Sequence, residues 1–144
     1  MMGRCFNSTV VNAPIDQVWI AVQNFHDMSW GEGVITSCEA VGDTPGNKVG
    51  AKRILNSSFH ETLRSIDHDA CELTYSIDDG PEPVSSESVQ EYIGTIRLRP
   101  VTDSGQTFCQ WETTYKSNDD DLVAAFCNPI YAALLEAMKA HFAR

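Results

Sequence analysis

Hydrophobic residues recur every four positions over the last part of the chain, from Asn118 to Arg144. They form two neighbouring rows: Leu122, Phe126, Ile130, Leu134, Met138 and Phe142, beside Val123, Cys127, Tyr131 and Leu135. Such rows make one broad apolar face of an α-helix. Asn118, Asp119 and Asp120 supply N-cap oxygens and negative charge where a helix begins. The pattern predicts a long amphipathic helix that needs a large apolar surface to pack against.

Before this helix, from about residue 34, apolar and polar residues alternate, which is the pattern of antiparallel strands with one wet face. The sets expected to face inward are Val49, Ala51, Arg53 and Leu55; Phe59, Glu61, Leu63 and Ser65; Cys71, Leu73, Tyr75 and Ile77; Tyr92, Gly94, Ile96 and Leu98; and Cys109, Trp111, Thr113 and Tyr115. Residues 34–41 are also strand-like. Turn-forming residues at 42–46, 67–69 and 102–105 separate several of these segments.

The N-terminal part predicts a strand over residues 4–11 and then a short helix to about Phe25. This helix has apolar residues at the helical spacing, including Val18 and Trp19. A second short helix or loop, with Trp30, follows over residues 26–33. The order predicts an α+β protein in which a curved antiparallel sheet of about seven strands wraps around the C-terminal helix. We expect residues 1–144 to form a single domain.

Composition excludes several classes of function. The net charge of −10 disfavours nucleic acid and anionic membranes as partners. No apolar run approaches the roughly 20 residues that span a bilayer, and the first residues lack a signal-peptide core, so we expect a cytoplasmic protein without stable membrane insertion. The sequence leaves the oligomeric state open between a monomer and a homodimer.

The five cysteines are odd in number and widely spaced, which predicts free thiols in a reducing compartment. The four histidines form no ligand motif, so we expect no metal site. No glycine-rich phosphate-binding motif occurs, so we expect no cofactor.

Two charged residues, Arg53 and Glu61, interrupt the apolar rows of adjacent predicted strands. If the hairpin between them centres on Ser57, Arg53 stands directly opposite Glu61, with Cβ atoms about 5 Å apart. Isolated charges on an inward face are costly. The sequence therefore predicts a partly buried Arg–Glu pair.

Tyrosines are expected near this pair. One register places Tyr75 beside Tyr92, and a tight turn at residues 103–104 places Tyr92 beside Tyr115 and Ile96 beside Trp111. The result would be an apolar pocket with a few convergent polar groups, as in small-molecule sites. The candidate ligand-contacting residues are Trp30, Tyr75, Trp111, Tyr115, Phe126 and Ile130.

The same groups suggest catalysis. Arg53 could bind a carbonyl, enolate or carboxylate oxygen, Glu61 could act as a general acid or base, and Tyr92 could donate to a developing oxyanion. The alternative is a purely structural ion pair, with the tyrosines as ordinary core residues.

Residues 11–19 at the first strand-to-helix step, Gly50 to Arg53, Glu61 to Leu63 followed by Ile66 and Asp67, and the long terminal helix resemble the START-like helix-grip superfamily. This superfamily includes Bet v 1-type plant proteins and polyketide cyclase/dehydrase-type bacterial proteins. The resemblance covers nearly the whole chain and implies a cavity between sheet and helix.

Within the superfamily, residues 50–97 are similar to lachrymatory factor synthases. Arg53 and Glu61 fall where those enzymes have an essential arginine and glutamate. Tyr75 and Tyr92 lie in similar tyrosine-bearing strands. This resemblance implies proton transfer in a rearrangement, while the pocket residues around these positions differ.

Three hypotheses follow. The first is binding of a small hydrophobic molecule in the cavity. The second is a polyketide cyclase/dehydrase- or isomerase-like enzyme that uses Arg53 and Glu61 for proton transfer. The third is a ligand-gated interaction module, for which the polar loop over residues 79–88 is the motivation.

Overall fold

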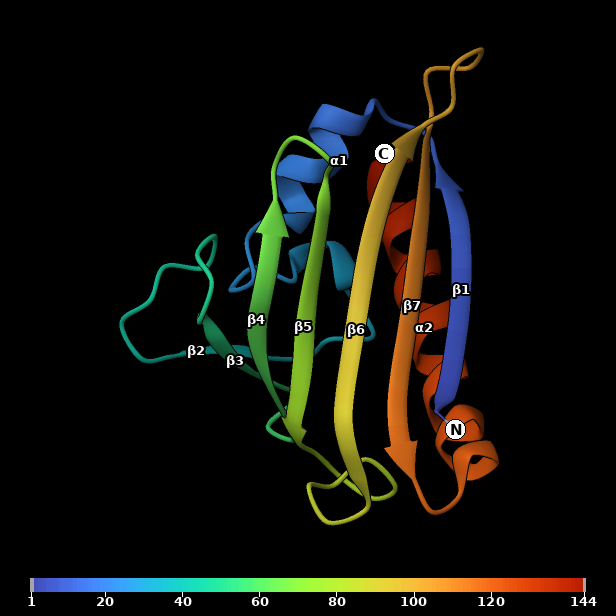
Figure 1. Cartoon of the computed structure of the whole chain (residues 1–144). Coiled ribbons are helices and arrows are strands. Elements are labelled where there is room, and N and C mark those ends of the chain that lie inside the picture. Colours follow the sequence, from blue (N-terminus) through green and yellow to red (C-terminus); the bar gives the residue numbers. More distant parts are fainter. Residues whose placement is uncertain (1, 144) are drawn as a thin grey trace.

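The computed structural model describes residues 2–143, which form one antiparallel sheet, one short and one long α-helix, and a 3₁₀ turn (Figure 1). The elements are β1 (Gly3–Val11), α1 (Ile15–Val22), η1 (Ser29–Gly31), β2 (Cys38–Val41), β3 (Lys52–Leu55), β4 (Phe59–Asp67), β5 (Glu72–Asp79), β6 (Val89–Pro100), β7 (Thr107–Ser117) and α2 (Asp120–Phe142). This order matches the predicted one.

The seven strands form one sheet in the order β1-β7-β6-β5-β4-β3-β2, so the first strand pairs with the last. Each neighbouring pair is antiparallel. The sheet curves, and α2 lies behind β7 and β1 while α1 and η1 cover the other half of the same face (Figure 1). This arrangement confirms the α+β helix-grip architecture.

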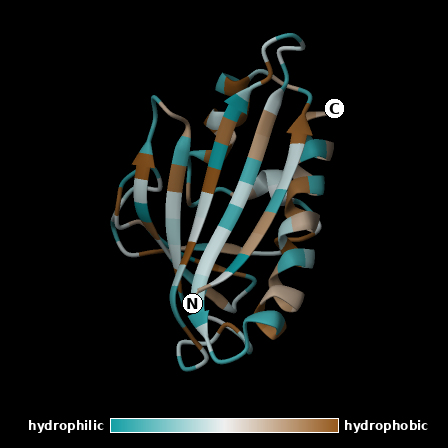
Figure 2. Cartoon of the chain, turned by 45° about the vertical axis from the view of Figure 1, so that its right-hand side comes forward, coloured by the Kyte–Doolittle hydropathy of each residue, from teal (hydrophilic) through white to brown (hydrophobic). Residues whose placement is uncertain are grey.

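Alternation along the strands is clear in β7, where Cys109, Trp111, Thr113 and Tyr115 are all buried. Figure 2 shows that hydrophobic and hydrophilic residues alternate along the strands. Three details of the expected pattern are wrong. Residues 34–37 precede β2 as a loop, Val49 is 59% exposed because β3 begins only at Lys52, and Ser65 is exposed because a bulge after Leu63 shifts the alternation.

Helix α2 begins where its acidic residues predict, since the Asp119 side chain accepts a hydrogen bond from the Leu122 backbone N–H at 3.1 Å. Its buried residues are Val123, Cys127, Tyr131, Leu134, Leu135 and Met138. The expected burial of Leu122 is wrong, because this side chain is 54% exposed. In a helix with 3.6 residues per turn, each step of four residues moves the side chain about 40° around the helix axis. The row that begins with the exposed Leu122 therefore reaches the buried face at Leu134 and Met138.

By length and composition alone α2 could cross a membrane, contrary to the expectation that no segment is apolar enough to do so. Here it packs its buried row along the concave face of the sheet, over β1 in particular. This is the position of a core helix.

The predicted registers are partly right. Arg53 pairs with Glu61, and Ile96 pairs with Trp111. The pairing of Tyr75 with Tyr92 is wrong, because Tyr75 stands opposite Gly94. The reason is space: a Cβ at Gly94 would lie 2.3 Å from Cζ of the Tyr75 ring, so only glycine admits the ring there.

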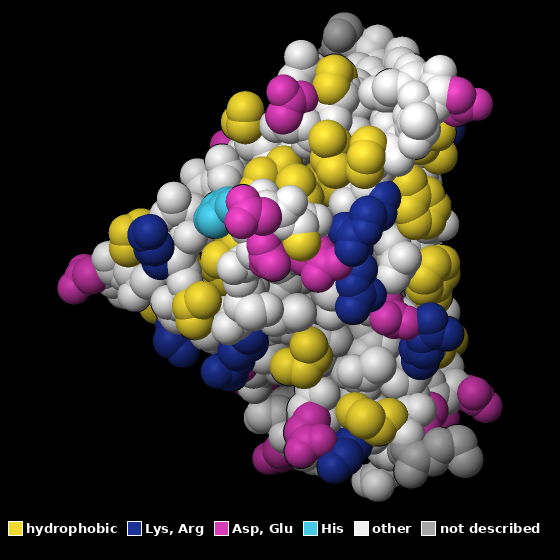
Figure 3. Space-filling view, turned by 45° about the horizontal axis from the view of Figure 1, so that its top comes forward, with side chains coloured by type: hydrophobic (Ala, Val, Ile, Leu, Met, Phe, Trp, Pro, Cys, Tyr) yellow, Lys and Arg dark blue, Asp and Glu magenta, His cyan; other side chains and the backbone are white. Residues whose placement is uncertain are grey.

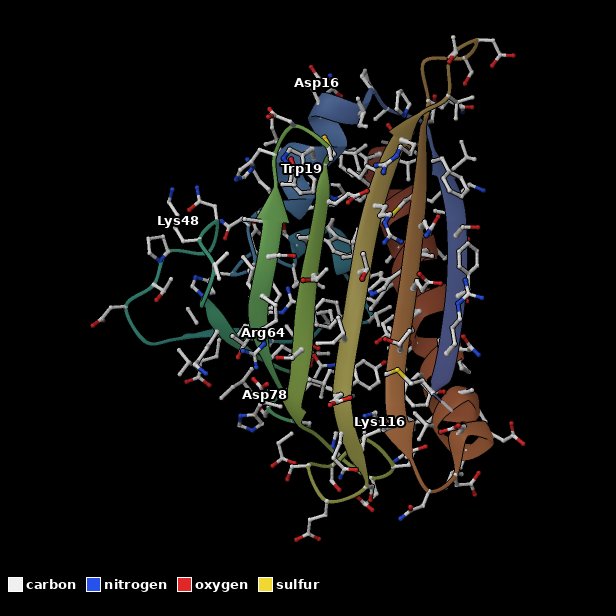
Figure 4. All side chains as sticks on the ribbon, viewed as in Figure 1. Asp16, Trp19, Lys48, Arg64, Asp78 and Lys116 are labelled. Atoms are coloured by element: carbon white, nitrogen blue, oxygen red, sulfur yellow. The ribbon has the colours of Figure 1, made fainter. Side chains whose placement is uncertain are left out.

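The outer face of the sheet carries paired charges. Arg64 on β4 and Asp78 on β5 lie 3.3 Å apart at this face (Figure 4). Basic and acidic side chains also lie next to one another on the face seen in Figure 3. The excess of negative charge is therefore interrupted by local ion pairs.

Candidate functional site

A cavity of about 140 Å³ lies between the sheet and α2. Its inner wall consists of buried side chains from the sheet and from α2, chiefly Arg53, Glu61, Tyr75, Trp111 and Tyr131. Its outer rim consists of partly exposed residues, chiefly Val34, Ile35, Asn56, Phe59 and Ile130. The cavity is therefore apolar over most of its surface and polar at one end.

The polar end is the predicted ion pair. Arg53 Nε donates to Glu61 Oε1 at 2.8 Å, and Arg53 Nη2 lies 2.7 Å from the same oxygen. The two side chains are only 4% and 6% exposed. The pair is thus almost fully buried, where the sequence predicted partial burial.

Arg53 is further fixed by the segment between α1 and η1. Its Nη1 donates to the Phe25 carbonyl oxygen at 3.1 Å and to Met28 Sδ at 3.3 Å. The guanidinium carbon lies 3.7 Å from the centre of the Phe25 ring, a cation–π contact. Sequence reasoning missed Phe25 and Met28, because nothing local links this segment to β3.

Burial raises the pKa of the Glu61 carboxyl, and the neighbouring Arg53 charge only partly offsets this. Because the pKa is higher in the folded than in the unfolded state, this carboxyl stabilises the fold in acid. That contribution is present below the unfolded value near 4.5 and is lost as the pH rises through the raised value.

We therefore expect the free energy of unfolding of the wild-type protein, relative to Glu61→Gln, to fall as the pH rises above about 4.5. Urea denaturation of both proteins from pH 4 to pH 8 measures this difference. A difference that grows with pH over this range would show instead that Arg53 dominates and lowers the pKa.

A chain of hydrogen bonds runs from the cavity wall into the core. Trp111 Nε1 donates to the Tyr75 hydroxyl at 2.9 Å, which lies 3.1 Å from the Tyr131 hydroxyl. Tyr131 also hydrogen-bonds Tyr92, which donates to Cys127 Sγ at 3.5 Å. Because Tyr92 gives its one hydroxyl hydrogen to Cys127, it accepts from Tyr131, and Tyr131 in turn accepts from Tyr75.

Burial raises the pKa of the Tyr75, Tyr92 and Tyr131 hydroxyls above the ordinary tyrosine value. These groups are therefore neutral at physiological pH. Sequence reasoning placed Tyr131 only in an apolar row of the helix. Its hydroxyl in the middle of that row was the signal that a polar partner was needed.

The structure brings five of the predicted site residues together at the cavity: Arg53, Glu61, Tyr75, Trp111 and Ile130. The other four do not line it. Tyr92 reaches it only through Tyr131, and Tyr115 stacks on Tyr92 with ring centres 5.5 Å apart. Trp30 lies behind Trp111 at 6.2 Å, and Phe126 packs on Phe59 at 6.5 Å.

No group of three or more His, Cys, Asp or Glu side chains that could hold a metal ion occurs within residues 2–143. The five cysteines are free thiols. Two of them approach the tyrosines: Cys127 accepts from Tyr92, and Cys5 Sγ lies 3.9 Å from the Tyr115 hydroxyl.

Residues 4–143 match the family described as "Polyketide cyclase / dehydrase and lipid transport", and the chain belongs to this family. A protein from Nitrosospira multiformis has the same fold at a TM-score of 0.93, with 39% identity over 96% of this chain and 95% of that one. No curated protein sequence matches the chain.

Two more distant structures show the fold alone. Protein XoxI from Bacillus cereus is 22% identical, with a TM-score of 0.79, over 98% of this chain and 96% of that one. Major latex-like protein 151 from Panax ginseng is 15% identical, with a TM-score of 0.78, over 99% of both chains. The predicted START-like, Bet v 1-like helix-grip fold is confirmed, and the family match agrees with the predicted resemblance to polyketide cyclase/dehydrase-type proteins.

Proposed function

We propose that this protein binds a small hydrophobic molecule in the cavity between the sheet and α2. The observation that carries the proposal is the cavity itself, about 140 Å³ with apolar walls and one polar end. Apolar pockets with a few fixed polar groups are the usual form of small-molecule sites. The family supports it, since lipid transport is part of its description.

Toluene is a suitable first probe, because it tests the apolar walls without engaging the polar end. We expect toluene to shift the NMR resonance of the Trp111 indole N–H. Ile130→Trp, at the rim, should abolish this shift by filling the cavity. Leu122→Trp is the matched control, because Leu122 lies on the same helix but is 54% exposed.

A Trp111 resonance that toluene leaves unmoved would contradict the proposal, as would equal shifts in wild type and Ile130→Trp. Native mass spectrometry of the gently purified protein then searches for the natural ligand.

A second candidate function is catalysis by proton transfer, which the raised pKa of Glu61 beside Arg53 favours. With a substrate that the protein turns over, Glu61→Gln should lower kcat by about 10²-fold or more if Glu61 is the acid or base. Tyr92→Phe should have a smaller effect, because Tyr92 acts only through Tyr131. Unchanged turnover in Glu61→Gln would rule out this role.

A ligand-gated interaction module stays a prediction. Pull-downs with and without ligand test it, and the loop before β6 is the segment to alter.

A further inference from the structure

The size of the cavity restricts the ligand. A volume of about 140 Å³ is close to the roughly 150 Å³ of an engineered apolar cavity that binds benzene. One six-membered ring with a small substituent fits such a space. A fused ring system or a long acyl chain exceeds this volume and would extend past the rim of partly exposed residues.

One carboxylate oxygen at the polar end is free to accept a hydrogen bond. Both contacts from Arg53 go to Glu61 Oε1, and no described residue donates to Oε2. Oε2 is not sealed in the protein either. Within residues 2–143, the sealed side-chain polar atoms without a partner are Trp30 Nε1 and Thr113 Oγ1. Oε2 therefore keeps some exposed surface, and its residue lines the cavity.

Few hydrogen-bond donors at the cavity are available to a ligand. The hydroxyls of Tyr75 and Tyr131 each donate to the next hydroxyl of the chain that begins at Trp111, so a ligand that only accepts would have to replace one of these hydrogen bonds. Arg53 donates through Nη1 to Phe25 and Met28, and its Nη2 keeps one N–H beside the Glu61 contact.

A hydroxyl group complements this arrangement, because it donates to Oε2 and also accepts from the remaining N–H. An ether oxygen can only accept. A carboxylate ligand would meet the Glu61 carboxylate, while the Arg53 charge is already paired.

We propose that the cavity selects a single-ring alcohol or phenol, whose hydroxyl donates to Glu61 Oε2 and whose ring lies between Trp111, Tyr131 and Leu134. This proposal rests on the proposed binding function and adds the class of ligand to it.

The test compares phenol, anisole, toluene and 2-naphthol by NMR titration of the wild-type protein at pH 8. Phenol should bind about tenfold more tightly than anisole or toluene, the difference that a hydrogen bond to a carboxylate contributes. 2-Naphthol should bind more weakly than phenol, because its second ring exceeds the cavity. These comparisons need no variant.

Glu61→Gln then tests whether Oε2 is the atom that accepts the hydrogen bond from the ligand. Arg53 should hold the amide oxygen, which places the NH₂ group where Oε2 was and turns an acceptor into a donor. The preference for phenol over anisole should fall below about twofold or reverse.

Four results are decisive against the proposal. Equal affinity for phenol and anisole in the wild type overturns the hydroxyl class, while toluene binding still supports the cavity. Tighter binding of 2-naphthol than of phenol overturns the size limit. If no probe binds, or if Ile130→Trp leaves all binding unchanged, the proposed binding function fails as well.

Discussion

Glu61→Ala is expected to lower the free energy of unfolding by about 3–5 kcal/mol. The variant removes the oxygen that accepts from Arg53 Nε and lies beside Nη2, so the buried guanidinium, 4% exposed, keeps its charge without this acceptor. Buried donors that lose their acceptor on a group that stays charged cost several kcal/mol, whichever protonation state Glu61 favours. Urea denaturation at pH 7 measures the loss.

The double variant Arg53→Met/Glu61→Leu should recover most of this loss, because it removes both charges and fills their space with apolar atoms. The exposed pair Arg64 and Asp78, on β4 and β5, is the matched control. Alanine at either position there should cost no more than about 1 kcal/mol. A double variant as unstable as Glu61→Ala would show that the pair itself, rather than charge neutrality, stabilises the fold.

The contrast between these two pairs bears on function. A protein that needed only stability could place apolar residues at positions 53 and 61, since a buried ion pair is weak evidence for stability. The pair lies at the end of a cavity, and Arg53 is held from three sides by Glu61, the Phe25 carbonyl oxygen and Met28. Such fixed polar groups are what a binding or catalytic site requires.

Sequence patterns predicted those features of this site that depend on local spacing. A short turn fixes the register of a hairpin, which is why the pairing of Arg53 with Glu61 could be predicted. The turn between β6 and β7 likewise placed Ile96 opposite Trp111. In both cases the alternation of side chains decided which residues face inward.

Features that depend on long-range packing could not be predicted in this way. The long loop between β5 and β6 leaves their register open, and the space taken by Tyr75 sets it opposite Gly94. The contacts of Phe25 and Met28 with Arg53 depend on how α1 and η1 lie over the sheet. Trp30 lies on η1 and Phe126 on α2. A periodic pattern does not fix how these helices are rotated about their own axes, so it could not predict whether either side chain reaches the cavity.

Gly94→Ala is expected to disturb both the fold and the cavity, although it adds a single methyl group. The new Cβ would lie 2.3 Å from Cζ and 2.5 Å from the hydroxyl oxygen of Tyr75. The Tyr75 ring is rigid and buried, and its hydroxyl is bonded to both Trp111 and Tyr131. The ring must therefore move and weaken both hydrogen bonds. Overpacking of this kind costs about 1–3 kcal/mol in the free energy of unfolding.

A double-mutant cycle with Tyr75→Leu separates this clash from any effect on β6 itself. Once the ring is gone, the methyl group at position 94 has space, so the cost of Gly94→Ala should nearly vanish in the Tyr75→Leu background. Urea denaturation gives the free energy of unfolding of the wild type, the two single variants and the double variant. The Trp111 indole N–H resonance reports whether the Tyr75 hydroxyl has moved in Gly94→Ala. Equal costs in the two backgrounds would mean that the strand requires glycine for a backbone reason. The register of β5 and β6 would then need another explanation than the space that Tyr75 occupies.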